Sequence, residues 1–113
     1  MSLARSITLW TKQEISTLFK SAQRLCWHTG LDVRVAPAKQ EHGRILIITP
    51  KKMGNAPERN RVRRRIKALF YENKLYECGF DWIFFAKPGI STLTFSQLQE
   101  FILETCLPKL PKR

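Results

Sequence analysis

The sequence predicts a single-domain α/β protein in which three helices are interspersed with three or four strands. Its 113 residues suit one domain with a modest core, and 43% of them are hydrophobic, as in a globular chain. Apolar residues recur with helical spacing in some segments and alternate with polar residues in others. No internal repeat or linker interrupts these segments, so residues 1–113 are predicted to form one domain.

Two segments predict amphipathic helices with clearly marked starts. Residues 11–14 match a capping box, and the apolar residues that follow predict a helix over residues 12–22. Residues 94–97 match a second capping box, at the start of a C-terminal helix whose apolar side ends at Cys106. Beyond that helix, residues 108–113 form a basic tail that is expected to fray.

Strands are predicted between the first helix and the middle of the chain. Leu31, Val33 and Val35 alternate with polar residues, which is typical of a half-buried strand. Residues 44–50 predict a second strand after a polar turn, and residues 25–27 predict a short irregular one. The order of elements is therefore a helix, two or three strands, a basic helix, a strand and a helix.

The basic helix is the most unusual segment, and an apolar strand over residues 81–89 follows it. From Arg59 to Lys67 there are six basic residues and no acidic one. Asn55 suits the N-cap position, which marks where this helix begins. At 100° per residue, four apolar side chains gather on one arc that would face a core. These residues are Val62, Ile66, Leu69 and Phe70.

The composition points to a polyanionic partner. The formal net charge is +11, and an excess of this size repels itself unless a partner neutralises it. Nucleic acid is the leading candidate, and an anionic membrane surface is the weaker one. No apolar run approaches the ~20 residues that span a bilayer, and the N-terminus lacks the pattern of a secretory signal.

The cysteines and histidines give no sign of a metal site. Cys26, Cys78 and Cys106 are scattered without the spacing of metal ligands, and neither His28 nor His42 has an i,i+4 partner. The three cysteines are interpreted as small buried hydrophobic residues in a reducing cytoplasm. We therefore expect a cytoplasmic protein that binds no metal.

Enzymatic motifs are absent, whereas the basic helix favours RNA binding. The chain contains no phosphate-binding glycine loop, no HExxH and no nucleophile elbow. A helix with a merely solvated face normally intersperses both signs of charge, which this one does not. A strand and a loop precede the basic helix, unlike a helix-turn-helix, and no strand carries the aromatic pattern of an RNA-recognition motif. The residues alone predict an α/β module that binds structured RNA through one helix.

The centre of the chain resembles a known signature. Residues 51–56, Lys-Lys-Met-Gly-Asn-Ala, and residues 58–66, Glu-Arg-Asn-Arg-Val-Arg-Arg-Arg-Ile, resemble the signature of the bacterial ribonuclease P protein subunit. The first helix and the strand over residues 81–88 fit the same family, so the resemblance covers essentially the whole chain. It implies a ribosomal-protein-S5-domain-2-like two-layer sandwich, with a left-handed crossover between parallel strands.

The resemblance also implies a function. In this family a catalytic RNA, with bound Mg²⁺, removes the 5′ leader from precursor tRNA, and the protein is an accessory subunit that binds no cofactor itself. The implied partners are ribonuclease P RNA and precursor tRNA, and no membrane. An alternative of another class is a non-catalytic ribosomal protein or RNA chaperone, which would share the arginine-rich helix but would not need a cleft for a leader.

Two sets of residues match the family's binding surfaces. The positions implied to bind the catalytic RNA are Lys51, Lys52, Asn55, Arg59, Asn60, Arg61, Arg63, Arg64 and Lys67. The positions implied to line the cleft for the single-stranded leader are Ile15 and Phe19 on the first helix, and Val33, Ile48 and Lys87 as outward positions of the sheet. Ile15 stands where the family usually has an aromatic residue.

Overall fold

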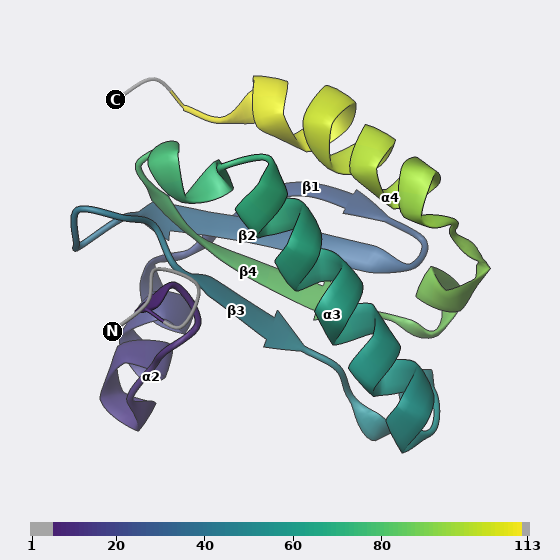
Figure 1. Ribbon diagram of the computed structural model, residues 1–113. Coiled ribbons are helices and arrows are strands. Elements are labelled where there is room, and N and C mark those ends of the chain that lie inside the picture. Colours follow the sequence, from purple (N-terminus) through teal and green to yellow (C-terminus); the bar gives the residue numbers. More distant parts are fainter. Residues whose placement is uncertain (1–5, 112–113) are drawn as a thin grey trace.

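The computed structural model describes residues 6–111 and contains one four-stranded sheet with helices on both faces (Figure 1). The strands lie in the order β1-β2-β4-β3, where β3 and β4 are parallel and the other neighbours are antiparallel. The elements are α2 (Lys12–Ser21), β1 (Gln23–His28), β2 (Leu31–Pro37), β3 (Ile45–Ile48), α3 (Ala56–Glu72), β4 (Phe80–Ala86) and α4 (Phe95–Glu100).

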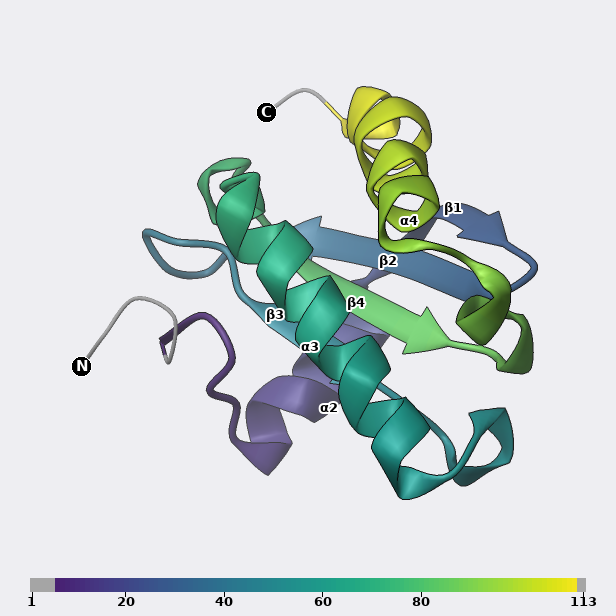
Figure 2. The ribbon, with the colours of Figure 1, turned by 45° about the vertical axis from the view of Figure 1, so that its right-hand side comes forward.

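The two faces of the sheet are covered unequally. The basic helix α3 and the C-terminal helix pack on one face, and α2 packs on the other (Figures 1 and 2). The larger core lies under α3, whose buried Ile66 and Phe70 meet the sheet residues Val33, Trp82 and Phe84. The smaller core contains Leu18, Ala36 and Ile83, with Ala22, Leu46 and Ile48 partly buried beside them. Helix α2 has only 10 residues and lies over part of its face of the sheet, so the described residues leave the rest of that face without a helix (Figures 1 and 2).

The helix starts were predicted correctly because they depend on local hydrogen bonds. In each case the cap side chain accepts from the backbone N–H three residues on, and that residue's side chain accepts from the cap N–H. The three capping boxes pair Thr11 with Glu14, Asn55 with Glu58, and Thr94 with Gln97. The first helix ends at Ser21, one residue before its predicted end.

The connection from β3 through α3 to β4 is the unusual step of the topology. It joins two parallel strands that are direct neighbours in the sheet. With α3 in front of the sheet, as in Figure 1, the chain passes from β3 to β4 in the left-handed sense. This crossover confirms the fold that the family resemblance implies.

The β-strands agree with the predicted segments, with small shifts at their ends. The short irregular strand is a full edge strand, β1, and its pairing with β2 shifts between Arg24 and Cys26 because Leu25 forms a bulge. Strand β3 is shorter than the predicted residues 44–50, and β4 begins one residue earlier than predicted.

Two expectations about the rest of the chain were wrong, one about the cysteines and one about the tail. Cys26 and Cys106 are joined in a disulfide between β1 and the C-terminal helix, so the interpretation of all three cysteines as reduced thiols does not hold. Cys78 is free. The C-terminal helix changes from α to π at Phe101 and stays π to Cys106. Its tail continues as a 3₁₀ turn over Leu107–Lys109, and Leu110 packs against the core, so the described part of the tail is docked.

Candidate nucleic-acid interface

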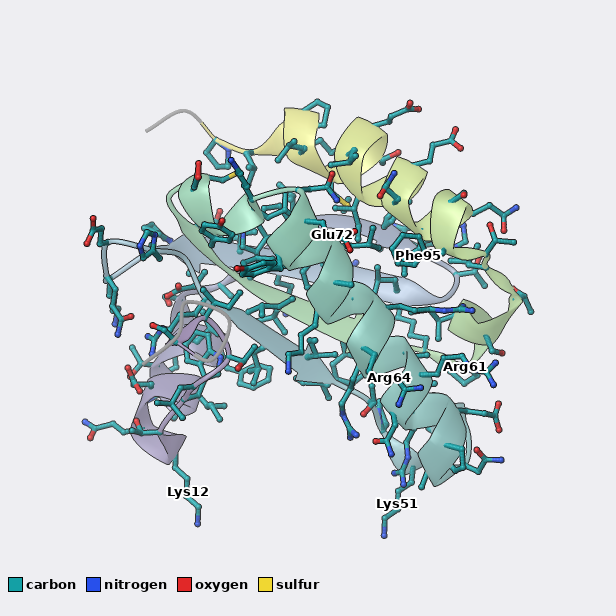
Figure 3. All side chains as sticks on the ribbon, viewed as in Figure 1. Lys12, Lys51, Arg61, Arg64, Glu72 and Phe95 are labelled. Atoms are coloured by element: carbon teal, nitrogen blue, oxygen red, sulfur yellow. A yellow bond between two sulfur atoms is a disulfide. The ribbon has the colours of Figure 1, made fainter. Side chains whose placement is uncertain are left out.

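The exposed side of α3 forms a dense cationic surface. Burial of its apolar arc against the sheet turns the charged positions toward solvent. Asn60, Arg61, Arg63, Arg64 and Lys67 are all exposed, whereas Arg59 and Arg65 are half-buried at the borders of the arc. Figure 3 shows Arg61 and Arg64 extending from α3, with Lys51 at the same end of the helix. We call Arg59 to Lys67 the arginine face.

Within the described residues, no carboxylate forms an ion pair with the arginine face. The three ion pairs found there join Arg24 and Arg34 to Asp32, and Arg44 to Glu14, all outside α3. The Glu58 carboxylate, the nearest along the helix, accepts from the backbone N–H of the N-cap Asn55. The charge of this face is therefore uncompensated by the fold.

A groove runs between α3 and the edge strand β3 and gathers part of the predicted site. Its volume is about 400 Å³, and residues 45–47 of β3 and Trp10 are among the residues that line it. The α3 residues that line it are Asn60, Arg63, Arg64 and Lys67. Arg63 donates a 2.8 Å hydrogen bond to the side-chain oxygen of Asn60, which restrains its guanidinium. The groove combines planar cationic donors with a strand edge, a chemistry that suits phosphates.

The remaining predicted basic positions lie just before α3. Lys51 and Lys52 are exposed on a short 3₁₀ helix, Lys51–Met53, which the buried side chain of Met53 anchors to the core. Asn55 is exposed, but its side-chain oxygen accepts the N–H of Glu58 at 2.9 Å, so only its amide NH₂ is available to a ligand. Lys51, Lys52 and the arginine face thus form one surface at the start of α3.

Helix α2 is fixed to the sheet by an ion pair in a polar pocket. The buried guanidinium of Arg44 donates to Glu14 at 2.7 Å and lies 3.9 Å from the centre of the Trp10 ring. Hydrogen bonds from the Thr11 N–H and from Arg44 lower the pKa of the Glu14 carboxyl. Burial raises the pKa of Asp81, although this carboxylate accepts the Arg44 backbone N–H at 2.8 Å. These contacts set the position of α2 over the sheet.

The predicted cleft residues of α2 lie beside its buried stripe. Leu18 is buried against the sheet, Ile15 is half-buried and Phe19 keeps 46% of its surface exposed. Thr17 and Ser21 line the polar pocket on one side of Leu18. At 100° per residue, Ile15 and Phe19 lie on the other side of Leu18, away from that pocket. Phe19 is therefore not a core residue.

The sheet positions predicted for the cleft require one correction. Val33 is fully buried in the core beneath α3, so the expectation that it points outward was wrong. The alternation along β2 contains the signal for this, because Val33 shares its face with the buried residues Leu31 and Val35. Ile48 lies on the face of α2, half-buried beside Leu18. Lys87 follows β4 with an extended backbone and is half-buried.

Other side chains on the open face were missed by the sequence analysis. Arg34 alternates with Val33 and Val35, and its side chain is 42% exposed. Phe85 is the only half-buried residue of β4, and its β3 partner is Ile48. Arg34, Phe85 and Ile48 come from three different strands, and no local sequence pattern shows the order of those strands in the sheet. Only Arg34 was indicated locally, as a polar position in the alternating strand.

Known proteins of one family match this chain in sequence. A family model described as Ribonuclease P matches residues 3–110. The ribonuclease P protein component of Roseiflexus is 35% identical over 81 residues, which cover 67% of this chain and 65% of that protein. The corresponding protein of Petrotoga mobilis is 28% identical, and the match covers 82% of each chain.

Solved structures show the same fold. The RNase P protein of Staphylococcus aureus superimposes with a TM-score of 0.77 at 25% identity, covering 90% of this chain and 93% of that one. The RNase P protein of Thermotoga maritima gives 0.77 at 20% identity, covering 93% and 98%. Among residues 6–111, no helix is long and apolar enough to cross a bilayer. With a family model that matches nearly the whole chain and a shared fold, the chain belongs to the ribonuclease P protein family.

Proposed function

We propose that this chain is the protein subunit of ribonuclease P, which promotes endonucleolytic removal of the 5′ leader from precursor tRNA. The observation that carries the proposal is the arginine face, where six cations lie without a carboxylate partner in the described part of the chain. Such a surface gains most from a densely charged polyanion, because each neutralised phosphate releases a condensed counterion.

The arginine face and the leader cleft would each bind a different RNA. The arginine face, with Lys51 and Lys52, binds the catalytic RNA, and the cleft between α2 and the open sheet face receives the single-stranded leader. Gripping the leader favours precursor over mature tRNA, since only the precursor has that segment. The catalytic RNA, with Mg²⁺, carries the bond chemistry, and the chain supplies binding and orientation.

Reconstitution tests the proposal directly. The chain is combined with a bacterial ribonuclease P RNA and precursor tRNA at low Mg²⁺, with protein alone and RNA alone as controls. We expect the protein to raise the rate of leader release by the RNA, and the protein alone to release no leader. A folded protein that binds RNA but never accelerates cleavage would contradict the proposal and favour a ribosomal or chaperone-type binding protein.

A charge-matched pair of variants tests the surface. Replacing Arg61 and Arg64 by Ala should weaken assembly with the catalytic RNA and reduce the slope of log K against log salt by roughly 0.7–0.9 for each lost phosphate contact. Both side chains are exposed, so the variant should fold. The control replaces the exposed Lys39 and Lys109, which lie outside α3. An equal change of slope in both variants would mean that RNA binding depends on the net charge of the protein and not on the arginine face.

A further inference from the structure

Trp27 is the most exposed large hydrophobic side chain in the described part of the chain, with 62% of its surface accessible. It lies on the edge strand β1 between two residues that face the C-terminal helix. Cys26 forms the disulfide with Cys106, and the His28 ring packs 5.3 Å from Phe101. Because successive side chains alternate between the faces of a strand, Trp27 projects from the opposite face, the one that α2 only partly covers.

The strand register places Trp27 at the end of a continuous row across that open face. Trp27 pairs with Asp32 of β2, Asp32 pairs with Phe85 of β4, and Phe85 pairs with Ile48 of β3. The row crosses three interstrand spacings, or roughly 14 Å. One end lies beside α2, where Ile48 packs near Leu18, and the other ends at the indole.

Two arginines are held beside the indole by one carboxylate. Arg24 and Arg34 face each other in the adjacent row and contact the same Asp32 oxygen, at 3.0 and 3.7 Å. Asp32 is buried, whereas the two arginine side chains are 53% and 42% exposed. One carboxylate between two guanidiniums leaves a net positive charge, and the arginines keep further N–H donors for a ligand. Asp32 thus orders two phosphate-binding groups next to a free aromatic ring.

We propose that Trp27, Arg24 and Arg34 form a nucleotide subsite, at which a base of single-stranded RNA stacks on the indole while a guanidinium binds its phosphate. This inference rests on the proposed function and extends the leader cleft to the β1 edge of the sheet. An exposed aromatic ring flanked by cations is the arrangement that single-strand binding surfaces use, and it tolerates any base because every base has a π face.

The length of the row gives the subsite a specific signature. A stacked strand advances about 3.4 Å per nucleotide, so 14 Å corresponds to about four nucleotides. A short leader held near Phe19 and Ile48 would not reach Trp27, whereas a leader several nucleotides longer would. The contribution of Trp27 should therefore depend on leader length, while a purely structural role would affect every substrate equally.

The experiment measures the affinity of the reconstituted holoenzyme for precursor tRNAs whose leaders range from one to ten nucleotides, and for mature tRNA. The variants are Trp27→Leu, which removes the ring, and Trp27→Phe, which keeps one. Trp27→Leu should match the wild type on mature tRNA and the shortest leaders, and lose about 5- to 150-fold on the longest. Trp27→Phe should recover most of that loss. Thermal unfolding of each variant checks that the ring does not stabilise the fold.

The outcomes separate this inference from the proposed function. If wild-type holoenzyme shows no preference for leaders at all, the leader-binding part of the proposed function fails. If the wild type prefers long leaders and Trp27→Leu behaves identically at every length, the subsite is refuted and the proposed function stands. An equal loss on mature tRNA also refutes the subsite. A third outcome also refutes the subsite: the protein associates with itself without RNA, and Trp27→Leu abolishes this association but leaves leader affinity unchanged. The ring would then belong to a contact between protein chains.

Discussion

Replacing Phe19 by Ala separates a role in the leader cleft from a role in folding. About half of the ring is exposed, so the change removes only part of the ~1.5–3 kcal/mol that full burial of a phenylalanine contributes. We expect a loss of about 1–1.5 kcal/mol in the free energy of unfolding and a fall in Tm of about 3–8 °C. Loss of one base stack should weaken precursor binding by ~1–3 kcal/mol, or about 5- to 150-fold, with mature tRNA nearly unaffected.

The neighbouring residue provides a matched control. Leu18 is on the same helix but only 4% exposed, so Leu18→Ala should cost about 2–5 kcal/mol of stability and leave the precursor-to-mature binding ratio of the folded protein unchanged. The two variants are compared by thermal unfolding and by equilibrium binding of both tRNA forms to the holoenzyme. A large stability loss in Phe19→Ala with an unaltered binding ratio would refute its place in the cleft.

Two further predictions concern stability. Glu14 has a pKa below its ordinary value of 4.5, so its ion pair with Arg44 stabilises the protein above that pH and the contribution is lost as the pH falls through the lowered pKa. The free energy of unfolding of Glu14→Gln should therefore fall less steeply with decreasing pH below 4.5 than that of the wild type. The same pH dependence of stability in both proteins would contradict this. Cys106→Ala opens a link that spans 80 residues and should lose up to ~4–5 kcal/mol under oxidising conditions. Adding reductant should lower the Tm of the wild type but not that of the variant, and equal sensitivity would mean that the bond does not form.

Features set by local chemistry could be predicted from the sequence. The capping boxes need only residues three apart, and the arginine face follows from the phase of Val62, Ile66 and Phe70 on one helix. Both involve neighbours within one or two turns, where spacing along the chain determines spacing in space. The basic surface could therefore be predicted without knowledge of any tertiary contact.

Pairings between distant segments were not predictable in the same way. Nothing near Cys26 or Cys106 indicates a bond, because it depends on the C-terminal helix lying across β1. The π turn from Phe101 to Cys106 likewise has no sequence signal that we can identify. Local alternation does assign Val33 to the buried face, so the outward position that the family resemblance implies for it disagrees with its phase along β2.

The handedness of the crossover links the two proposed RNA surfaces. About 98% of connections between parallel strands are right-handed, so physical reasoning alone would have chosen the wrong hand here. With the strand order unchanged, a right-handed connection would place α3 on the other face of the sheet, over Ile48 and Phe85. That arrangement would bury the row that ends at Trp27. The left-handed path instead puts α3 over Val33 and Phe84, so only the short helix α2 covers the other sheet face, and the arginine face lies at the surface on the α3 side. The topology of one connection therefore keeps the arginine face and the proposed leader cleft on opposite sides of the sheet.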